Sequence, residues 1–401
     1  MLPDAIERFM NWLEQYGLEG YDLYDLWATG YGKWAKGLYH KRKAFGAPFV
    51  IPVFLADFLW PGVRRIVAAK KRYATSDAHF AKAYLFLYEL TDKQEYLKKA
   101  IKIADEMLTY ASDGYSGPCW GYPFDWQTNR GLWPKGIPFI TSTPYVYHVF
   151  TKLYDVTKVE KFHDVARGIA AFAQFDLNKT LLPNGTTASS YSPLDNTSVV
   201  NANAYRAELL VDSAIRFDNK EQLAEAEETI RFVLAAQDED GSWLYDVVNP
   251  HDNFVDNFHT CFVLKKLYQL NKHLQREDIR LAIQRGYDFY LDNLLDESGL
   301  PIPFWQVNRM QLVKREMYDF AEGINLGVLL ADDHPKAWET AKRLATGLLE
   351  KYQTREGYFI ARELLLGKQL SLPMPRWPQA QLIAALTALQ VRMTNSQNAI
   401  N

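Results

Sequence analysis

The chain of 401 residues is poor in cysteine: Cys119 and Cys261 are too few for a disulfide framework. It also lacks an excess of basic residues, because 45 Lys and Arg stand against 48 Asp and Glu and give a net charge of −3. Such a balance supplies no long-range field for nucleic acid or an anionic membrane. No uninterrupted apolar run is long enough for a membrane-spanning helix. We therefore expect no nucleic-acid partner and no transmembrane segment.

The first residues also lack the pattern of a signal peptide. Asp4 and Glu7 are acidic where a signal peptide has a basic end before an apolar run. The sequence contains no Walker loop and no Gly-x-Gly-x-x-Gly motif after a strand, so nucleotide cofactors are not indicated. We expect a cytoplasmic protein without a cofactor.

Apolar helices recur along the chain. Six segments begin with polar or N-capping residues and continue as apolar helices, and their starts are about 55 to 65 residues apart. These segments are 76–90, 141–154, 200–217, 256–270, 318–331 and 376–389. The first five are each followed, after a short turn, by a more charged helix: 94–110, 158–173, 220–237, 277–294 and 335–352. We interpret each pair as an antiparallel hairpin with the charged helix outside.

The connections back to the next inner helix share a second pattern, an acidic or small polar residue followed by Gly and then an aromatic residue. Asp240-Gly-Ser-Trp243 and Glu356-Gly-Tyr-Phe359 are examples, and each predicts a tight turn. The chain is rich in such rings, with 11 Trp, 24 Tyr and 22 Phe. All these loops should lie on the side where the inner helices begin. We therefore expect a polar cavity with an aromatic rim at that mouth, suited to a sugar ring.

The sixfold helix pairs, the Gly-aromatic loops and the motif Asp256-Asn-Phe-His259-Thr resemble the (α/α)6-toroid superfamily of carbohydrate-active proteins. More closely, they resemble toroid proteins encoded among bacterial surface-polysaccharide genes. The resemblance covers about residues 76–389 and implies an all-α (α/α)6 toroid that binds an oligosaccharide or polysaccharide precursor. We expect one domain over residues 1–401, in which 1–74 form a closing helix and cap, 75–392 the repeats and 393–401 a tail. The fold leaves the reaction open, because hydrolases, lyases, epimerases and binding proteins share it.

Two pairs of residues are the main catalytic candidates. Asp319 and Glu322 lie three apart on the fifth inner helix, and such carboxylates can divide acid and base work. Asp256 and His259 are likewise three apart on the fourth inner helix, where Asp256 can orient the imidazole. The alternatives are an acidic first turn for the first pair, and an N-cap beside a buried histidine for the second.

Other candidates fall at the starts of the inner helices and in the loops. Arg206 and Arg376 are candidate clamps for a sugar carboxylate, because a guanidinium can bind it bidentately. Trp120, Trp126 and Trp243 are predicted to stack on sugars, and Asp125 is a further possible acid. The remaining predicted substrate-binding residues are Asn201, Tyr205, Asn257, Tyr318 and Trp377. The alternative for this whole group is packing within the helix seams and loops.

The leading hypothesis is a glycoside hydrolase of bacterial polysaccharide metabolism that uses inner-helix carboxylates. The second is a uronate lyase or C5-epimerase using His259, Tyr205 and arginines. The third is a glycan-binding or assembly protein without catalysis. The most distant is a zinc enzyme similar to lanthionine-cyclase-like toroids, with Cys119, His259 and Cys261 as ligands. The Gln237…Trp243 segment also resembles a terpene-cyclase repeat, but only in a single copy.

Overall fold

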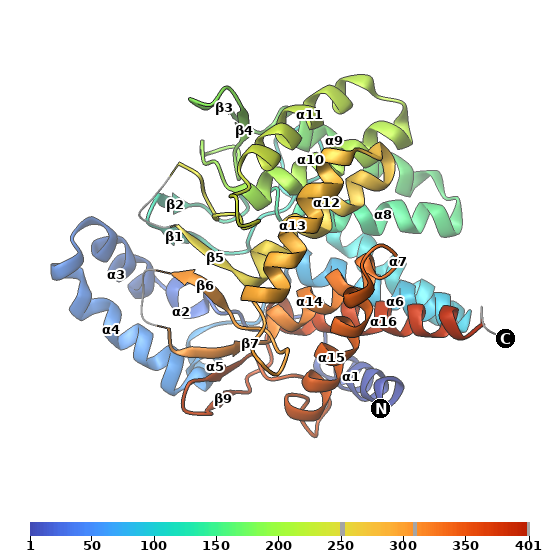
Figure 1. The fold of residues 1–401 in the computed structure, drawn as a ribbon. Helices are drawn as coiled ribbons and strands as arrows, with labels where there is room; N and C mark the ends of the chain where they lie inside the picture. The colour runs from blue at the N-terminus through green and yellow to red at the C-terminus, as the bar shows by residue number, and fades with distance from the viewer. Residues whose placement is uncertain (249–252, 308–310, 399–401) are drawn as a thin grey trace.

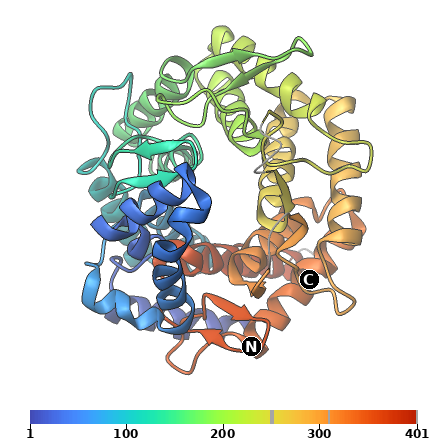
Figure 2. The ribbon, with the colours of Figure 1, turned by 90° about the vertical axis from the view of Figure 1, so that its left-hand side faces the viewer.

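The computed structural model describes residues 1–248, 253–307 and 311–398 (Figure 1). Within these residues, six apolar helices begin on one side of the molecule and line the inside of a ring (Figure 2). These inner helices are α6 (Ala74–Thr91), α8 (Thr143–Thr157), α10 (Val200–Phe217), α12 (Asn257–Leu274), α14 (Met317–Leu330) and α16 (Ala380–Asn398). The apolar periodicity thus located every inner helix, and it gave the bounds of α10 without error.

Five outer helices follow the first five inner ones: α7 (Gln94–Leu108), α9 (Glu160–Phe175), α11 (Lys220–Ala235), α13 (Glu277–Asn293) and α15 (Pro335–Lys351). Four of the five hairpin turns contain a non-glycine residue with positive φ directly after the inner helix: Asp92, Lys158, Asp218 and Gln275. A left-handed residue at this position ends the helix and reverses the chain within a few residues. The short turns therefore produce the predicted antiparallel hairpins.

The ring closes through its first and last elements. The inner helices contact one another in sequence order, and α16 contacts α6. The N-terminal helix α1 (Leu2–Tyr16) packs against α16 and supplies the outer partner that the sixth inner helix lacks. The predicted closure by the N-terminal helix is confirmed.

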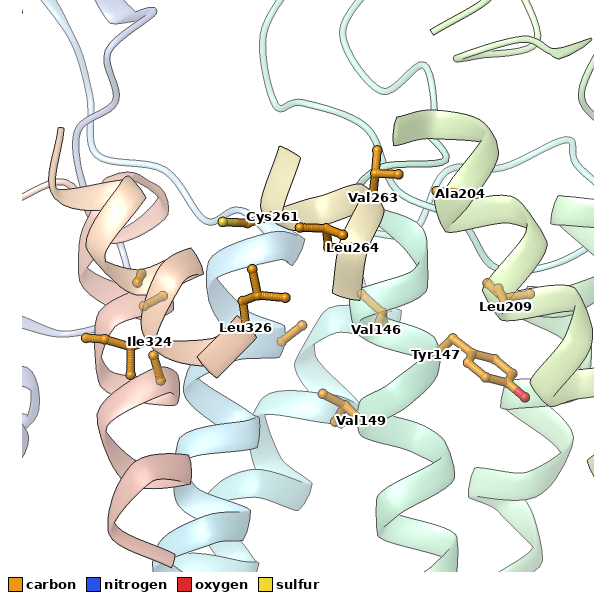
Figure 3. Close-up of a cluster of buried hydrophobic side chains, with 14 of the residues drawn as sticks. Val146, Tyr147, Val149, Ala204, Leu209, Cys261, Val263, Leu264, Ile324 and Leu326 are labelled. Carbon is orange, nitrogen blue, oxygen red and sulfur yellow. The ribbon is translucent and has the colours of Figure 1, made fainter. Parts of the chain in front are cut away.

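Aliphatic side chains hold the inner helices to one another and to the outer layer. Val146 and Val149 of α8, Leu209 of α10, Leu264 of α12 and Leu326 of α14 belong to one buried cluster (Figure 3). Truncating a side chain of this kind to Ala typically costs about 2–5 kcal/mol. The packing fixes which face of each helix is directed to the ring axis.

Short antiparallel strands occupy the connections that return to the inner helices. They are β1 (Trp126–Thr128), β2 (Gly131–Trp133), β3 (Lys179–Leu181), β4 (Thr187–Ser189), β5 (Phe254–Asp256), β6 (Phe304–Val307), β7 (Val313–Glu316), β8 (Arg362–Leu364) and β9 (Gln369–Leu370). β5 pairs with β6 and β7 with β8, so loops of successive repeats are joined. Gly241 has φ of 93°, as the predicted tight turn requires. All the strands lie on the side where the inner helices begin (Figure 1).

A helical cap stands on the same side of the ring. It consists of α2 (Asp25–Ala28), α3 (Gly30–Lys41), α4 (Lys43–Leu59), the 3-10 turn η1 (Pro61–Val63) and α5 (Arg64–Val67). The helical path breaks between Leu59 and Pro61, where α4 ends and η1 begins. Buried Arg64 donates to the carbonyls of Asp22 and Leu23 and fixes the end of the cap to its beginning.

The sixth inner helix differs from its predicted start at residue 376. The π-type turn η3 (Pro375–Gln379) comes first, and α16 begins at Ala380. Pro375 and Pro378 lack the amide protons that a regular helix uses, so the apolar periodicity overestimated this helix at its start.

Candidate active site

Asp256 and His259 form the best-defined polar pair at the mouth of the ring. Asp256 ends β5 in an extended conformation and caps α12, because its Oδ1 accepts the backbone N–H of His259 at 3.0 Å. The His259 ring donates from Nδ1 to Asp256 Oδ2 at 2.7 Å. An ionised carboxylate only accepts, so this bond places the ring proton on Nδ1 and leaves Nε2 as a possible base. The side chain of His259 is 22% exposed, whereas that of Asp256 is buried.

A small pocket adjoins this pair between α10 and α12. Asn201, Trp243, Tyr245 and Phe254 line it together with Asp256 and His259. Its volume is about 10 Å³, the space of roughly one water molecule. Asn201 is buried, and its Oδ1 has no hydrogen-bond partner among the described residues. Only three of the nine residues that line the pocket, Asn201, Asp256 and His259, are polar or charged, and a sugar ring enters the pocket only if the surrounding side chains move.

Aromatic rings fill the ring axis below the mouth. Buried Tyr205, Phe262 and Tyr318 form this aromatic floor, and Tyr145, Phe258 and Trp377 pack against them. The Tyr145 and Tyr205 hydroxyls are hydrogen-bonded to each other, and Tyr318 stacks on Trp377 with ring centres 4.1 Å apart. The structure thus brings together three predicted substrate-binding residues, Tyr205, Tyr318 and Trp377. The polar cavity expected at the mouth therefore does not continue along the axis, where a floor of aromatic rings follows instead.

Asp319 is a buried carboxyl group without a partner. Its exposed fraction is 0%, and neither oxygen is hydrogen-bonded among the described residues. Burial, reinforced by the negative charges of Glu316 and Asp256, raises the pKa of Asp319 well above its usual range. Glu316 itself accepts from Arg362 Nε at 2.5 Å. Burial therefore favours the protonated form of Asp319, which interacts electrostatically with Asp256, the carboxylate that holds His259.

Glu322 lies in a separate layer of buried charges. It pairs with Lys265 of α12, while Glu208 of α10 accepts from Lys266 at 2.8 Å and lies 2.9 Å from His148 Nε2. Burial alone would raise the pKa of Glu208, but His148 and Lys266 outweigh it and lower that pKa to about 2. The expectation of Asp319 and Glu322 as a carboxylate pair open to substrate is therefore corrected.

Sequence reasoning missed the cations of this layer, Lys82, His148, Lys265 and Lys266. Each interrupts the apolar run of an inner helix, and a charge at such a position needs a partner or a cavity. That signal was present in the sequence. The identity of each partner was not, because the partners come from different helices.

The two predicted carboxylate clamps are already occupied. Arg206 donates to the carbonyl of Ala173 at 2.8 Å and to the carboxylate of Glu225 at 2.8 Å, so it faces the outer helices. Arg376 binds both carboxylate oxygens of Asp22, at 2.6 and 2.8 Å, and connects the ring to the cap. Both arginines are structural in this arrangement, which corrects the prediction.

Three further predicted site residues also have structural roles. Trp120 is 0% exposed and donates from its indole nitrogen to the carbonyl of Met107 at 2.9 Å. Asn257 is buried and donates to the carbonyl of Leu294 at 2.8 Å. Asp125 pairs with Lys33 of the cap at 2.6 Å, and this bond lowers the pKa of Asp125. Trp120 and Asn257 are therefore unavailable for the predicted contact with a sugar, and the pairing with Lys33 favours the charged form of Asp125, which opposes its predicted role as an acid.

The positions of Trp126 and Trp243 are compatible with the predicted role, which is stacking on a sugar. Trp243 is 4% exposed and donates to the carbonyl of Val233 at 3.0 Å, yet its ring lines the pocket. Trp126 is half-buried among the aromatic rings of the β1–β2 loop, with Trp133 at 4.9 Å between ring centres. Both belong to the aromatic rim of the mouth.

The described residues contain no group of three or more His, Cys, Asp or Glu side chains arranged to hold a metal ion. Cys119 and Cys261 are both buried, and burial raises the pKa of each thiol. Their nearest polar contacts are the Ser112 carbonyl and the Asn257 side chain. The zinc set of Cys119, His259 and Cys261 is therefore not assembled in this part of the chain.

No protein-family model matches the chain, and no curated protein is similar to it in sequence. Solved structures with the same fold include a cellobiose 2-epimerase from Bacillus thermoamylovorans, at 12% identity and a TM-score of 0.63, with 80% of this chain and 88% of that one covered. A GH76A α-1,6-mannanase from Salegentibacter sp. aligns at 12% identity and a TM-score of 0.59, covering 80% and 90%. A polysaccharide lyase aligns at 13% identity and a TM-score of 0.56, covering 80% and 91%. The chain thus has the (α/α)6-toroid fold, which these three proteins of different activity share.

Proposed function

We propose that the protein is a carbohydrate-active enzyme in which His259 transfers a proton at a sugar carbon. The observation that carries this proposal is the bond from His259 Nδ1 to Asp256, which leaves Nε2 at the pocket as a base. The similarity to an epimerase and a lyase supports it, as does the similarity to a D-mannose isomerase. The substrate class we infer is an oligosaccharide or a precursor of a bacterial polysaccharide.

The reaction requires a carbon acid beside a carbonyl or carboxylate group. Nε2 takes the proton from that carbon, and the electron pair of the broken C–H bond moves into the adjacent C=O group as an enolate. Protonation of the same carbon on its opposite face gives an epimer, and protonation of the former carbonyl carbon gives an isomer. Loss of a substituent from the next carbon instead gives an unsaturated sugar. Asp256 keeps the imidazole in the required tautomer and stabilises its protonated form.

The test is solvent exchange in heavy water with a panel of reducing disaccharides and uronate polymers. A proton transfer at carbon puts deuterium into the recovered sugar, and an elimination gives a product that absorbs in the ultraviolet. Replacing His259 by Gln should abolish both signals while leaving the melting temperature within a few degrees. New reducing ends without either signal would contradict the proposal, and so would binding without any turnover across the panel.

A glycoside hydrolase is the second candidate, and the state of Asp319 favours it. Burial raises the pKa of Asp319 and so favours its protonated form, which a general acid requires. However, Asp319 is fully buried and Glu322 pairs with Lys265, so neither oxygen pair faces the mouth without a rearrangement. This candidate predicts that the Asp319→Asn variant releases no reducing ends.

A further inference from the structure

The longest helix of the cap has an unusual surface. α4 carries a single charged side chain after Lys43, Asp57, and this residue pairs with Arg64. The exposed face of the helix contains Phe45, Ile51 and Leu55, which are 62%, 51% and 46% exposed. A helix that is apolar on every face normally lies in a protein core or in lipid. Within the described part of the chain, α4 is not covered by a protein core, because only Gly46 and Val53 of this helix are buried.

The apolar surface extends over the whole of residues 30–67. Ten of the 22 large apolar side chains that are exposed in the described residues lie in this segment. They are Tyr31, Trp34, Phe45, Ile51, Phe54, Leu55, Leu59, Trp60, Ile66 and Val67. Together they form what we call the apolar cap surface. A patch this dense marks an interaction site, whereas single exposed apolar residues need no explanation.

The same segment is strongly basic, in contrast to the rest of the chain. Residues 30–67 hold seven Lys and Arg and one acidic residue, within a chain of net charge −3. Lys41, Arg42 and Lys43 are exposed at the turn between α3 and α4, and they form no ion pair among the described residues. Trp34, Tyr31 and Trp60 add aromatic rings of the type that is enriched at the boundary between lipid and water.

We propose that the apolar cap surface binds the face of an anionic phospholipid bilayer. Apolar side chains enter the boundary of headgroups and acyl chains, and the basic turn contacts the negative headgroups. Among the described residues, no single helix is long and apolar enough to cross a bilayer. Residues 43–59 and 61–67 are long and apolar enough to span a bilayer only when taken together, but the two segments are bent by 102° relative to each other. A bent apolar pair fits an element lying in the membrane interface.

The position of the cap places a bound bilayer near the mouth of the ring. α3 and α4 project from the side on which the strands and the starts of the inner helices lie (Figure 1). His259 begins one of those helices, so a bound bilayer lies on the same side as the candidate active site. The basic turn distinguishes a bilayer from a second copy of this chain, because two such turns would repel each other across a symmetric contact.

Flotation of the full chain with vesicles tests the proposal. Vesicles of phosphatidylglycerol and phosphatidylcholine should carry the protein upward in a density gradient, and vesicles of phosphatidylcholine alone should carry much less. The Phe45→Glu/Ile51→Glu/Leu55→Glu variant should bind on the order of 100-fold more weakly or worse. The matched control replaces Val159, Ile215 and Leu281, which are 46%, 55% and 45% exposed near the hairpin turns on the opposite side of the ring, by Glu and should bind like the parent.

A second variant keeps the proposal testable if the first does not fold. Replacing Lys41, Arg42 and Lys43 by Gln should reduce affinity by about fivefold per charge and make the remaining binding insensitive to salt. Absence of flotation by the parent overturns the proposal. So does binding that both cap variants retain, or a dimer that the apolar variant dissociates in the absence of lipid. Flotation does not depend on turnover, so its outcome is separate from that of the proposed function.

Discussion

The carboxylate of Asp256 binds His259 twice, through the backbone N–H at 3.0 Å and through the ring at 2.7 Å. The capping role and the orienting role, which the sequence left as alternatives, are performed by one side chain. The helix start therefore fixes the imidazole as well as the backbone.

Two substitutions of Asp256 can distinguish its contribution to stability from its contribution to turnover. Asp256→Asn keeps an oxygen for the cap but loses the charge that stabilises a protonated imidazole, so turnover should fall by about 10²–10⁴-fold with little loss of stability. Asp256→Ala loses the cap as well and should cost about 1 kcal/mol of unfolding free energy. Steady-state kinetics and urea denaturation measure the two effects. Equal turnover in the Asn variant and the parent would remove Asp256 from the mechanism.

Asp319 gives the sharpest separation between the two candidate functions. Because its folded pKa is raised above the unfolded value, burial of this group is favourable at low pH and becomes costly as the pH rises. Asp319→Asn should therefore be at least as stable as the parent at pH 7, by up to about 2 kcal/mol. Deuterium incorporation should change by only a few fold. If the parent instead releases reducing ends, and this release is lost in an Asp319→Asn variant with an intact fold, the hydrolase is favoured.

The buried ion pairs around Glu208 predict a loss of stability in acid. The folded pKa of Glu208 is about 2 and its ordinary value is 4.5, so its stabilisation is present above pH 4.5 and is lost as the pH falls toward 2. The difference corresponds to about 3 kcal/mol. Urea denaturation of the parent and the Glu208→Gln variant between pH 2 and 6 should show the two stabilities converging. Parallel curves would show that His148 and Lys266 do not hold the carboxylate charged.

Lys82 predicts the opposite trend at high pH. Burial, together with Lys265 and Lys266, lowers the pKa of Lys82 from 10.5 to about 8, so its charge destabilises the fold at neutral pH. Lys82→Met should raise the unfolding free energy by about 2 kcal/mol at pH 7. As the pH rises from 8 to 10.5, the parent releases this proton on folding and the advantage should disappear. A destabilised variant at pH 7 would show instead that Glu208 and Glu322 need this third cation.

The sequence predicted the helices well because each has one strong apolar period. It predicted Asp256 and His259 as a pair because their spacing sets their relation within a single helix. It failed for Arg206, since neighbouring residues of an inner helix point about 100° apart. Tyr205 faces the axis, whereas Arg206 faces the outer layer. Only the packing of α10 against its neighbours decides between these two directions.

Two other failures have a different cause. The partner of Glu322 is Lys265 of another helix, and spacing along the chain carries no information about such a pair. The whole-chain charge of −3 concealed a local excess of positive charge, because it averages a basic cap with an acidic remainder. A charge count over residues 30–67 alone would have shown the difference.

The packing of α1 on α16 sets an order of events during synthesis. Helix α1 must wait for α16 before it can pack, because its apolar partner surface is made more than 360 residues later. Until then the early hairpins form a curved, incomplete stack with an uncovered edge at each end, which is a state prone to association and a natural client for chaperones. We expect the ring to become resistant to proteases only when α16 has emerged from the ribosome and packed against α1 and α6.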